Sequence, residues 1–133
     1  MRDKPCLTAA DIQKAMAACK AEADKNQWKV AIAIVDDGGN LILLHKMDET
    51  QLGSIRVALD KAESSLRFKR PTKAFEDGVA GGRNAILGLT GATPIEGGLP
   101  IMSGGKIIGA IGISGGSAAQ DGQVAKAGAD TVK

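Results

Sequence analysis

The sequence predicts an α+β fold, in which helices pack against an antiparallel sheet. Two segments have the form of β-hairpins, because each places a glycine-rich turn between two apolar runs. Stretches with apolar residues at helical spacing precede, separate and follow these hairpins. The expected order is helix, hairpin, one or two helices, hairpin and helix, which favours α+β over a parallel doubly wound fold.

Composition limits the classes of protein to consider. With 133 residues, 44% of them hydrophobic, the chain is expected to form a single domain over residues 1–133. A net charge of +2 and only three aromatic residues argue against a nucleic-acid partner. No apolar run is long enough for a membrane span or typical of an export signal, so we expect a cytoplasmic protein with no membrane partner. Cys6 and Cys19 lack CxxC spacing and are expected to be reduced thiols, with Cys19 on a buried helix face.

The first helix is expected over about residues 9–26, because Thr8 and Asp11 have the form of a capping box. The apolar residues of this helix recur at helical spacing: Ile12, Ala15, Met16, Cys19 and Ala23.

Residues 28–35 are β-rich and apolar on both faces from Val30 onward, which predicts a central strand. The turn Asp36–Asn40 then returns the chain as an antiparallel strand over Leu41–Lys46.

The middle of the chain predicts helices. A second helical stripe begins at Ile55 and must end before Pro71, since the residue before a proline resists helical angles. Thr72 is expected to cap a short helix over about residues 73–77, and residues 83–87 predict one further helical turn.

The last third of the chain is rich in glycine. Leu99–Met102 and Lys106–Ser114 predict the second hairpin. Ser117 with Gln120 forms a capping box for a last helix over about residues 118–131. Gly109 and Gly112 lie inside the predicted strand, where we expect close packing, with approach of a ligand as the alternative. The spacing matches neither a Rossmann fingerprint nor a P-loop.

Several side chains are candidates for binding. Gly115, Gly116 and Ser117 open a helix, where free N–H groups suit a carboxylate or phosphate. His45, the only histidine, is a candidate metal or heme ligand or general base, or else a half-solvated histidine at a strand end. Lys46 and Asp48 stand where that strand runs into a loop, as binding groups or as a solvated pair.

A second group of candidates is basic. Arg67, Lys69, Arg70 and Lys73 form a local cluster that suits an anionic group such as a propionate, or is simply a solvated face. Asp121, in the first turn of the last helix, is explained by the helix dipole alone. The residues indicate no metal site and no catalytic constellation.

Four segments together resemble the GlcG/HbpS-like family, which includes heme-binding proteins and a domain attached to some corrinoid adenosyltransferases. They are VDDGGNLILLHKMD, ALDKAESSLRFKRPT, GGLPI and KIIGAIGISGGSAAQDGQVAKAG, and they span nearly the whole chain. The resemblance implies a profilin-like sandwich with about five antiparallel strands. It also implies homo-oligomers, from dimers to octamers, and heme binding in some members.

The resemblance further implies a heme site in which Thr72, in the RPT segment, supplies a hydroxyl oxygen. Phe68, Arg70 and Lys73 would line that site, and His45 is a further candidate heme ligand. The chain departs from the family at Lys46, where arginine is frequent, and at Gly122, where an acidic residue is usual.

Three functions follow as hypotheses. The first is a small-molecule binding protein for heme or a related tetrapyrrole. The second is an enzyme or accessory protein of small-molecule catabolism, holding an organic acid at Gly115–Ser117 with help from Lys46 or His45. The third is a ligand-free oligomeric assembly module.

Overall fold

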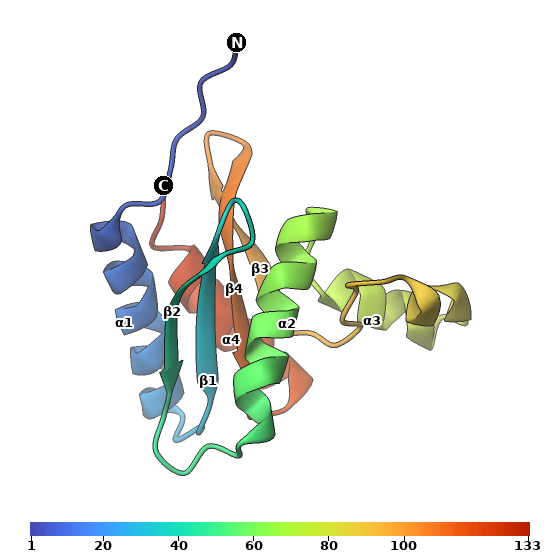
Figure 1. The fold of residues 1–133 in the computed structure, drawn as a ribbon. Coiled ribbons are helices and arrows are strands. Elements are labelled where there is room, and N and C mark those ends of the chain that lie inside the picture. The colour runs from blue at the N-terminus through green and yellow to red at the C-terminus, as the bar shows by residue number, and fades with distance from the viewer.

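A computed structural model describes residues 1–133 and contains an antiparallel sheet with helices on both faces, as an α+β fold requires (Figure 1). The elements run along the chain as α1 (Ala9–Lys25), β1 (Ala31–Asp36), β2 (Leu41–Lys46), α2 (Gly53–Phe68), α3 (Lys73–Ala80), the 3₁₀ helix η1 (Asn84–Gly88), β3 (Gly98–Ser103), β4 (Lys106–Ser114) and α4 (Ala118–Ala129). Both predicted capping boxes are present, at Thr8 and at Ser117.

The sheet has four strands in the order β2-β1-β4-β3. The expectation of about five strands was wrong, because the chain between α2 and β3 forms α3 and η1 and adds no strand. Neighbouring strands are antiparallel throughout. The sheet is therefore built from two hairpins that join through β1 and β4.

The hydrophobic core has two layers, one on each face of the sheet. Ile32 and Ile34 of β1 pack with α1 and α4, whereas Ala31, Ala33 and Val35 pack with α2. These five side chains are all 0% exposed, which confirms the predicted central strand. Residues on α2 that face β1 and β4 are mostly alanine and serine, so α2 lies close to the sheet.

The segment from α3 through η1 projects away from the sheet (Figure 1). Its base is tied to α2 by Phe68 and Phe75, whose rings meet edge to face with centroids 5.5 Å apart. Thr72 does not cap α3, contrary to expectation: its backbone is helical and its side chain makes no cap bond. That side chain instead accepts a hydrogen bond from the N–H of Gly98 in β3.

Close packing explains the strand glycines, as expected. A Cβ on Gly112 would collide with the Ala58 carbonyl and lie 2.6 Å from the Ala62 nitrogen of α2, and one on Gly109 would meet Leu7 and Val35. Gly115 has a φ of +135°, and a Cβ there would lie 2.9 Å from the Val30 Cα. Gly115 is therefore explained by packing against Lys29 and Val30, just before β1, with no ligand required.

No helix in this structure is both long enough and apolar enough to cross a membrane.

The two cysteines differ sharply in environment. Cys6 is exposed, whereas Cys19 is 0% exposed and its thiol donates to the Val124 carbonyl, 3.4 Å away. Burial raises the pKa of the Cys19 thiol to about 12.

We therefore expect a thiol reagent such as DTNB at pH 8 to modify one thiol per chain quickly and the second only as the chain unfolds. The Cys6→Ser variant should lose the fast phase, and a fast phase that survives would contradict the burial of Cys19.

The same burial predicts a dependence of stability on pH. The Cys19 thiol of the unfolded chain ionises near a pKa of about 8.5, whereas that of the folded chain ionises only near about 12. The free energy of unfolding should therefore fall as the pH rises from about 8.5 toward 12.

Candidate functional site

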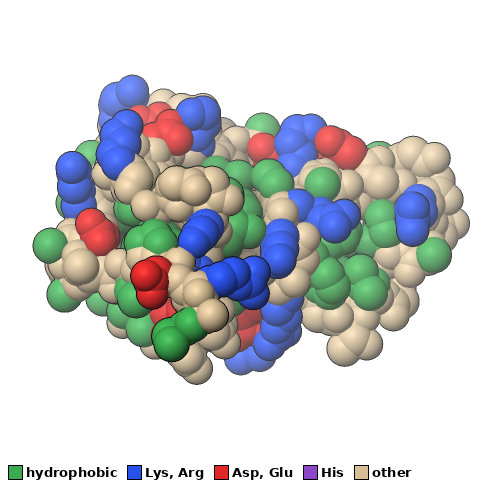
Figure 2. Space-filling view, turned by 90° about the horizontal axis from the view of Figure 1, so that it is seen from above, with side chains coloured by type: hydrophobic (Ala, Val, Ile, Leu, Met, Phe, Trp, Pro, Cys, Tyr) green, Lys and Arg blue, Asp and Glu red, His purple; other side chains and the backbone are tan.

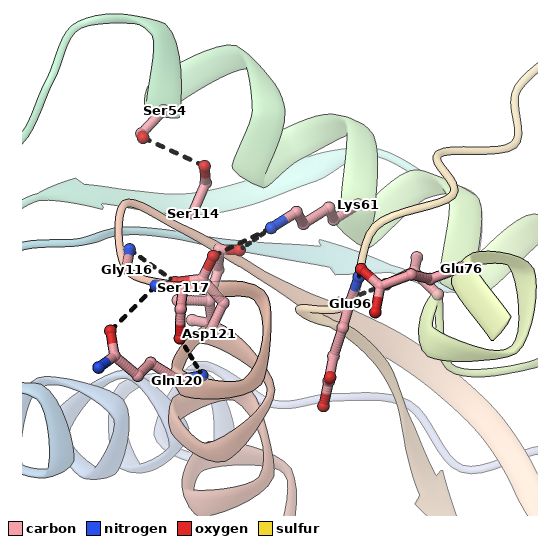
Figure 3. A network of polar contacts seen from close by, with 12 residues as sticks. Ser54, Lys61, Glu76, Glu96, Ser114, Gly116, Ser117, Gln120 and Asp121 are labelled. Carbon is pink, nitrogen blue, oxygen red and sulfur yellow. Dashed lines mark hydrogen bonds and ion pairs between the residues drawn. The ribbon is translucent and has the colours of Figure 1, made fainter. Parts of the chain in front are cut away.

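The N-terminus of α4 is a candidate anion site, but the N–H groups of Gly116 and Ser117 already have acceptors within the chain (Figure 3). The N–H of Gly116 donates to Asp121 Oδ1 at 2.9 Å. The N–H of Ser117 donates to the Gln120 side chain at 2.9 Å, and the Gln120 N–H returns a bond to the Ser117 hydroxyl. An organic acid would have to displace the protein's own oxygens here, so this end of α4 offers weak support for an acid-binding enzyme.

A buried ion pair lies beneath that helix end. Lys61 on α2 is 1% exposed and its Nζ lies 3.1 Å from Asp121 Oδ2 and 2.9 Å from the Ile113 carbonyl oxygen. Figure 3 shows the Lys61 side chain reaching from α2 toward Asp121. Since Ile113 belongs to β4, the pair joins α2, β4 and α4.

Asp121 thus has a structural role beyond the helix dipole, which corrects the sequence interpretation. Burial raises the pKa of its carboxyl, and the Lys61 ammonium and the N–H of Gly116 oppose that rise. Lys61 itself was missed. Its position was a usable signal, because Ala58, Lys61, Ala62 and Ser65 all lie on the buried face of α2.

Thr72 is fully buried. Its Oγ1 accepts the Gly98 N–H at 2.9 Å, and its own N–H donates to the Gly98 carbonyl at 3.0 Å. This two-way bridge holds the start of α3 against β3. In this conformation the hydroxyl oxygen has no exposed face for a ligand.

The predicted basic cluster divides between two places. Arg70 lies over the ring of Phe75, 5.5 Å from its centroid, and donates to the Phe68 carbonyl. Lys73 pairs with Asp77 at 2.8 Å on the exposed side of α3. Arg67 and Lys69 instead face a cleft at the end of the sheet that holds both hairpin turns.

That cleft, here called the upper cleft, lies between the N-terminal segment, the two hairpin turns and the end of α2. It comprises a hollow of about 550 Å³ and an adjoining one of about 250 Å³, which share Lys4, Lys69 and Ile107. No local sequence pattern indicates this cleft, because Lys4, Lys69 and Lys106 are far apart along the chain.

His45 lies at the opposite end of the sheet, in a hollow of about 240 Å³. It pairs with Ile32 across the β1–β2 ladder and so points to the face covered by α1. Half-buried His45 shares this hollow with Met47, Asp48 and three residues from α1 and the segment before β1: Lys20, Asp24 and Lys29. His45 and Asp48 are thus brought together, and two lysines stand beside them.

Lys46 follows His45 on β2 and points to the other face of the sheet, since side chains alternate along a strand. His45 and Thr72 are also separated. On β1, Ile32 pairs with His45 of β2 on one side and with Ile113 of β4 on the other. Thr72 is hydrogen-bonded to Gly98, which lies on β3 at the far edge of the sheet. Three strand spacings amount to about 14 Å, so one ligand atom cannot be bound by both residues.

Comparisons with known proteins place this architecture among relatives. Residues 7–130 match the family model described as haem degrading protein HbpS-like. Protein GlcG of Escherichia coli K12 is 41% identical over 114 residues, which cover 86% of this chain and 85% of GlcG.

Two solved structures are similar over nearly their whole lengths. The PduOC:heme complex has a TM-score of 0.87 at 28% identity and covers 97% of this chain and 96% of its own. A double mutant of HbpS from Streptomyces reticuli has a TM-score of 0.88 at 27% identity, and the match covers 100% of this chain and 91% of the HbpS chain.

Proposed function

The chain belongs to the HbpS-like family, and from this premise we propose that it binds heme or a related tetrapyrrole. Two observations outside the chain support the proposal. The family model carries a haem-related description, and PduOC, which has the same fold, was crystallised with heme. Within the chain, the observation that carries it is the position of His45.

The hollow around His45 has features that suit heme. Imidazole is a common axial ligand of heme iron, and this ring is half-buried and faces a hollow. Met47 adds an apolar wall, with 8% of its surface exposed. Lys20 and Lys29 line the same hollow, and lysine ammonium groups suit the two propionates of heme.

The size of the hollow bears on how heme would be held. A volume of about 240 Å³ is below the roughly 300–1,000 Å³ of most small-molecule pockets. A macrocycle on His45 would therefore keep much of its surface exposed or covered by a second chain. Weakly enclosed heme exchanges readily, which suits uptake or transfer. When bound, heme supplies the redox and ligand chemistry, and the residues here bind and orient it.

Thr72 remains the second candidate ligand, with Phe68, Arg70 and Lys73 as the residues that the family resemblance proposes for its site. Ligation by its hydroxyl requires the Thr72–Gly98 bridge to open, which separates the start of α3 from β3. The geometry therefore favours His45.

A hemin titration tests the proposal. The full chain should give a saturable shift of the Soret band with a fixed number of hemes per chain. His45→Ala should weaken hemin binding by about tenfold or more, since a ligand bond and not only apolar contact is lost. Thr72→Val, which removes the hydroxyl and keeps the shape, should leave the Soret spectrum unchanged. Metal-free protoporphyrin IX should bind with no dependence on His45.

One result would overturn His45 as the iron ligand, and another would overturn heme binding altogether. Hemin binding lost in Thr72→Val but kept in His45→Ala would assign the iron to Thr72. Hemin binding that is neither saturable nor stoichiometric in the unmodified chain would end the heme proposal itself.

We also propose that the chain forms a homo-oligomer. The outer strand β2 leaves Leu41 and Ile42 exposed at 45% and 46%, within the apolar run Leu41–Leu44. Exposed apolar edge strands in soluble proteins are normally covered. Light scattering of the full chain should give more than one subunit, and Ile42→Lys should shift the mass toward the monomer.

A further inference from the structure

The upper cleft carries an excess of positive charge that no part of the proposed heme site uses. Five basic residues line it, namely Arg2, Lys4, Arg67, Lys69 and Lys106, against two acidic residues, Asp3 and Asp37. The net charge of the whole chain is only +2, so the rest of the molecule is net negative. Seen from above, Lys and Arg side chains gather around the centre of this face (Figure 2).

Part of this charge has no carboxylate partner. Lys4 pairs with Asp37 at 2.9 Å and Arg67 with Glu63 at 3.5 Å. Lys69 and Lys106 form no ion pair, and Lys106 Nζ meets only the Asp3 backbone carbonyl, at 2.6 Å. Lys69 and Lys106 come from different elements and line the larger hollow without an ion-pair partner, and Asp3 is the only acidic residue in the lining of that hollow.

The backbone at Lys69 is unusual. This residue ends α2 with a φ of +56°, a left-handed conformation in which glycine or asparagine is less strained than lysine. Its N–H donates to the Ser65 carbonyl, which fixes the turn. A lysine occupies this strained position and lines both hollows of the cleft.

Part of the lining of the cleft is apolar. Ile107 lines both hollows, Met102 lines the larger one and is 43% exposed, and Leu66 lines the smaller one. The larger hollow, at about 550 Å³, has the size of typical small-molecule pockets. The lining therefore combines basic and apolar residues, which suits a ligand with an anionic group and an apolar part.

We propose that the upper cleft is a second binding site, for a small organic anion that joins a carboxylate or phosphate group to an apolar part. Lys69 and Lys106 bind the anionic group, and Ile107 and Met102 contact the apolar part. The site goes beyond heme binding, because it lies next to the β1–β2 turn, whereas His45 is five residues along β2 from Asn40, about 17 Å away.

The test uses 8-anilinonaphthalene-1-sulfonate, which joins one sulfonate to apolar rings and fluoresces when bound. We expect one saturable site on the full chain. Lys69→Asn, which suits the left-handed backbone, and Lys106→Gln should each raise the Kd of the dye by about threefold to tenfold. Lys14→Gln removes an exposed lysine from α1 as a matched control and should leave the Kd unchanged.

Competition identifies the anionic group. Displacement of the dye by inorganic phosphate assigns a phosphate ligand, and displacement by succinate assigns a carboxylate. The proposal is overturned if neither competes, or if both cleft variants bind the dye as the unmodified chain does. His45→Ala should leave dye binding intact, so the failure of this site and the failure of the heme site are distinguishable.

Discussion

Replacing Lys61 by methionine should lower the free energy of unfolding by about 3–5 kcal/mol. The substitution keeps the volume of the side chain but leaves the Asp121 carboxylate, 2% exposed, without the ammonium that lies 3.1 Å from it. The Ile113 carbonyl loses a donor at the same time. Chemical denaturation of the two chains measures the difference.

An exposed ion pair supplies the control. Lys126 and Asp130 form a surface ion pair at the C-terminal end of α4, and Lys126→Met should lower the free energy of unfolding by less than about 1 kcal/mol. The Lys61→Met, Asp121→Leu double variant should recover part of the loss, because no buried charge then remains. A Lys61→Met chain within 1 kcal/mol of the unmodified one would show that the buried pair does not hold α2, β4 and α4 together.

The second large effect is expected at Gly112. Gly112→Ala should cost at least about 3 kcal/mol or prevent folding, because the added methyl group would collide with the Ala58 carbonyl of α2. Backbone on both sides cannot move aside as a flexible side chain can. Thermal unfolding followed by circular dichroism gives the measurement.

Gly53→Ala is the matched control. Gly53 begins α2 with open space around its Cα, so this change should stay within about 1 kcal/mol of the unmodified chain. If Gly112→Ala unfolded at the same temperature as Gly53→Ala, the close approach of α2 to β4 would be refuted.

Local signals were sufficient for most of the fold. The capping residues Thr8 and Ser117 fixed two helix starts, and the strands Leu41–Lys46 and Lys106–Ser114 have the predicted bounds. These features depend on residues within a few positions of one another. The missing fifth strand is a different case. The expectation of a fifth strand rested on the family resemblance, and residues 78–97 contain no alternating apolar and polar pattern that predicts a strand.

The sites depend on contacts that are remote in sequence, and local patterns identified them less well. The Thr72 hydroxyl suits a cap or a ligand by sequence, but Gly98, 26 positions later, already donates to it. The free N–H groups expected before α4 are likewise occupied, because Asp121 folds back onto Gly116. The upper cleft needs Lys4, Lys69 and Lys106 together, and only the folded chain brings them there.

The proposal that His45 holds heme iron is tested most directly by rescue with free imidazole. His45→Gly removes the ring and leaves space where it stood, so the variant should give a weak and shifted Soret band with hemin. Millimolar imidazole should restore the spectrum of the unmodified chain, beyond its effect on hemin without protein. A His45→Gly chain that binds hemin with the unmodified affinity and spectrum, before any imidazole is added, would contradict the account.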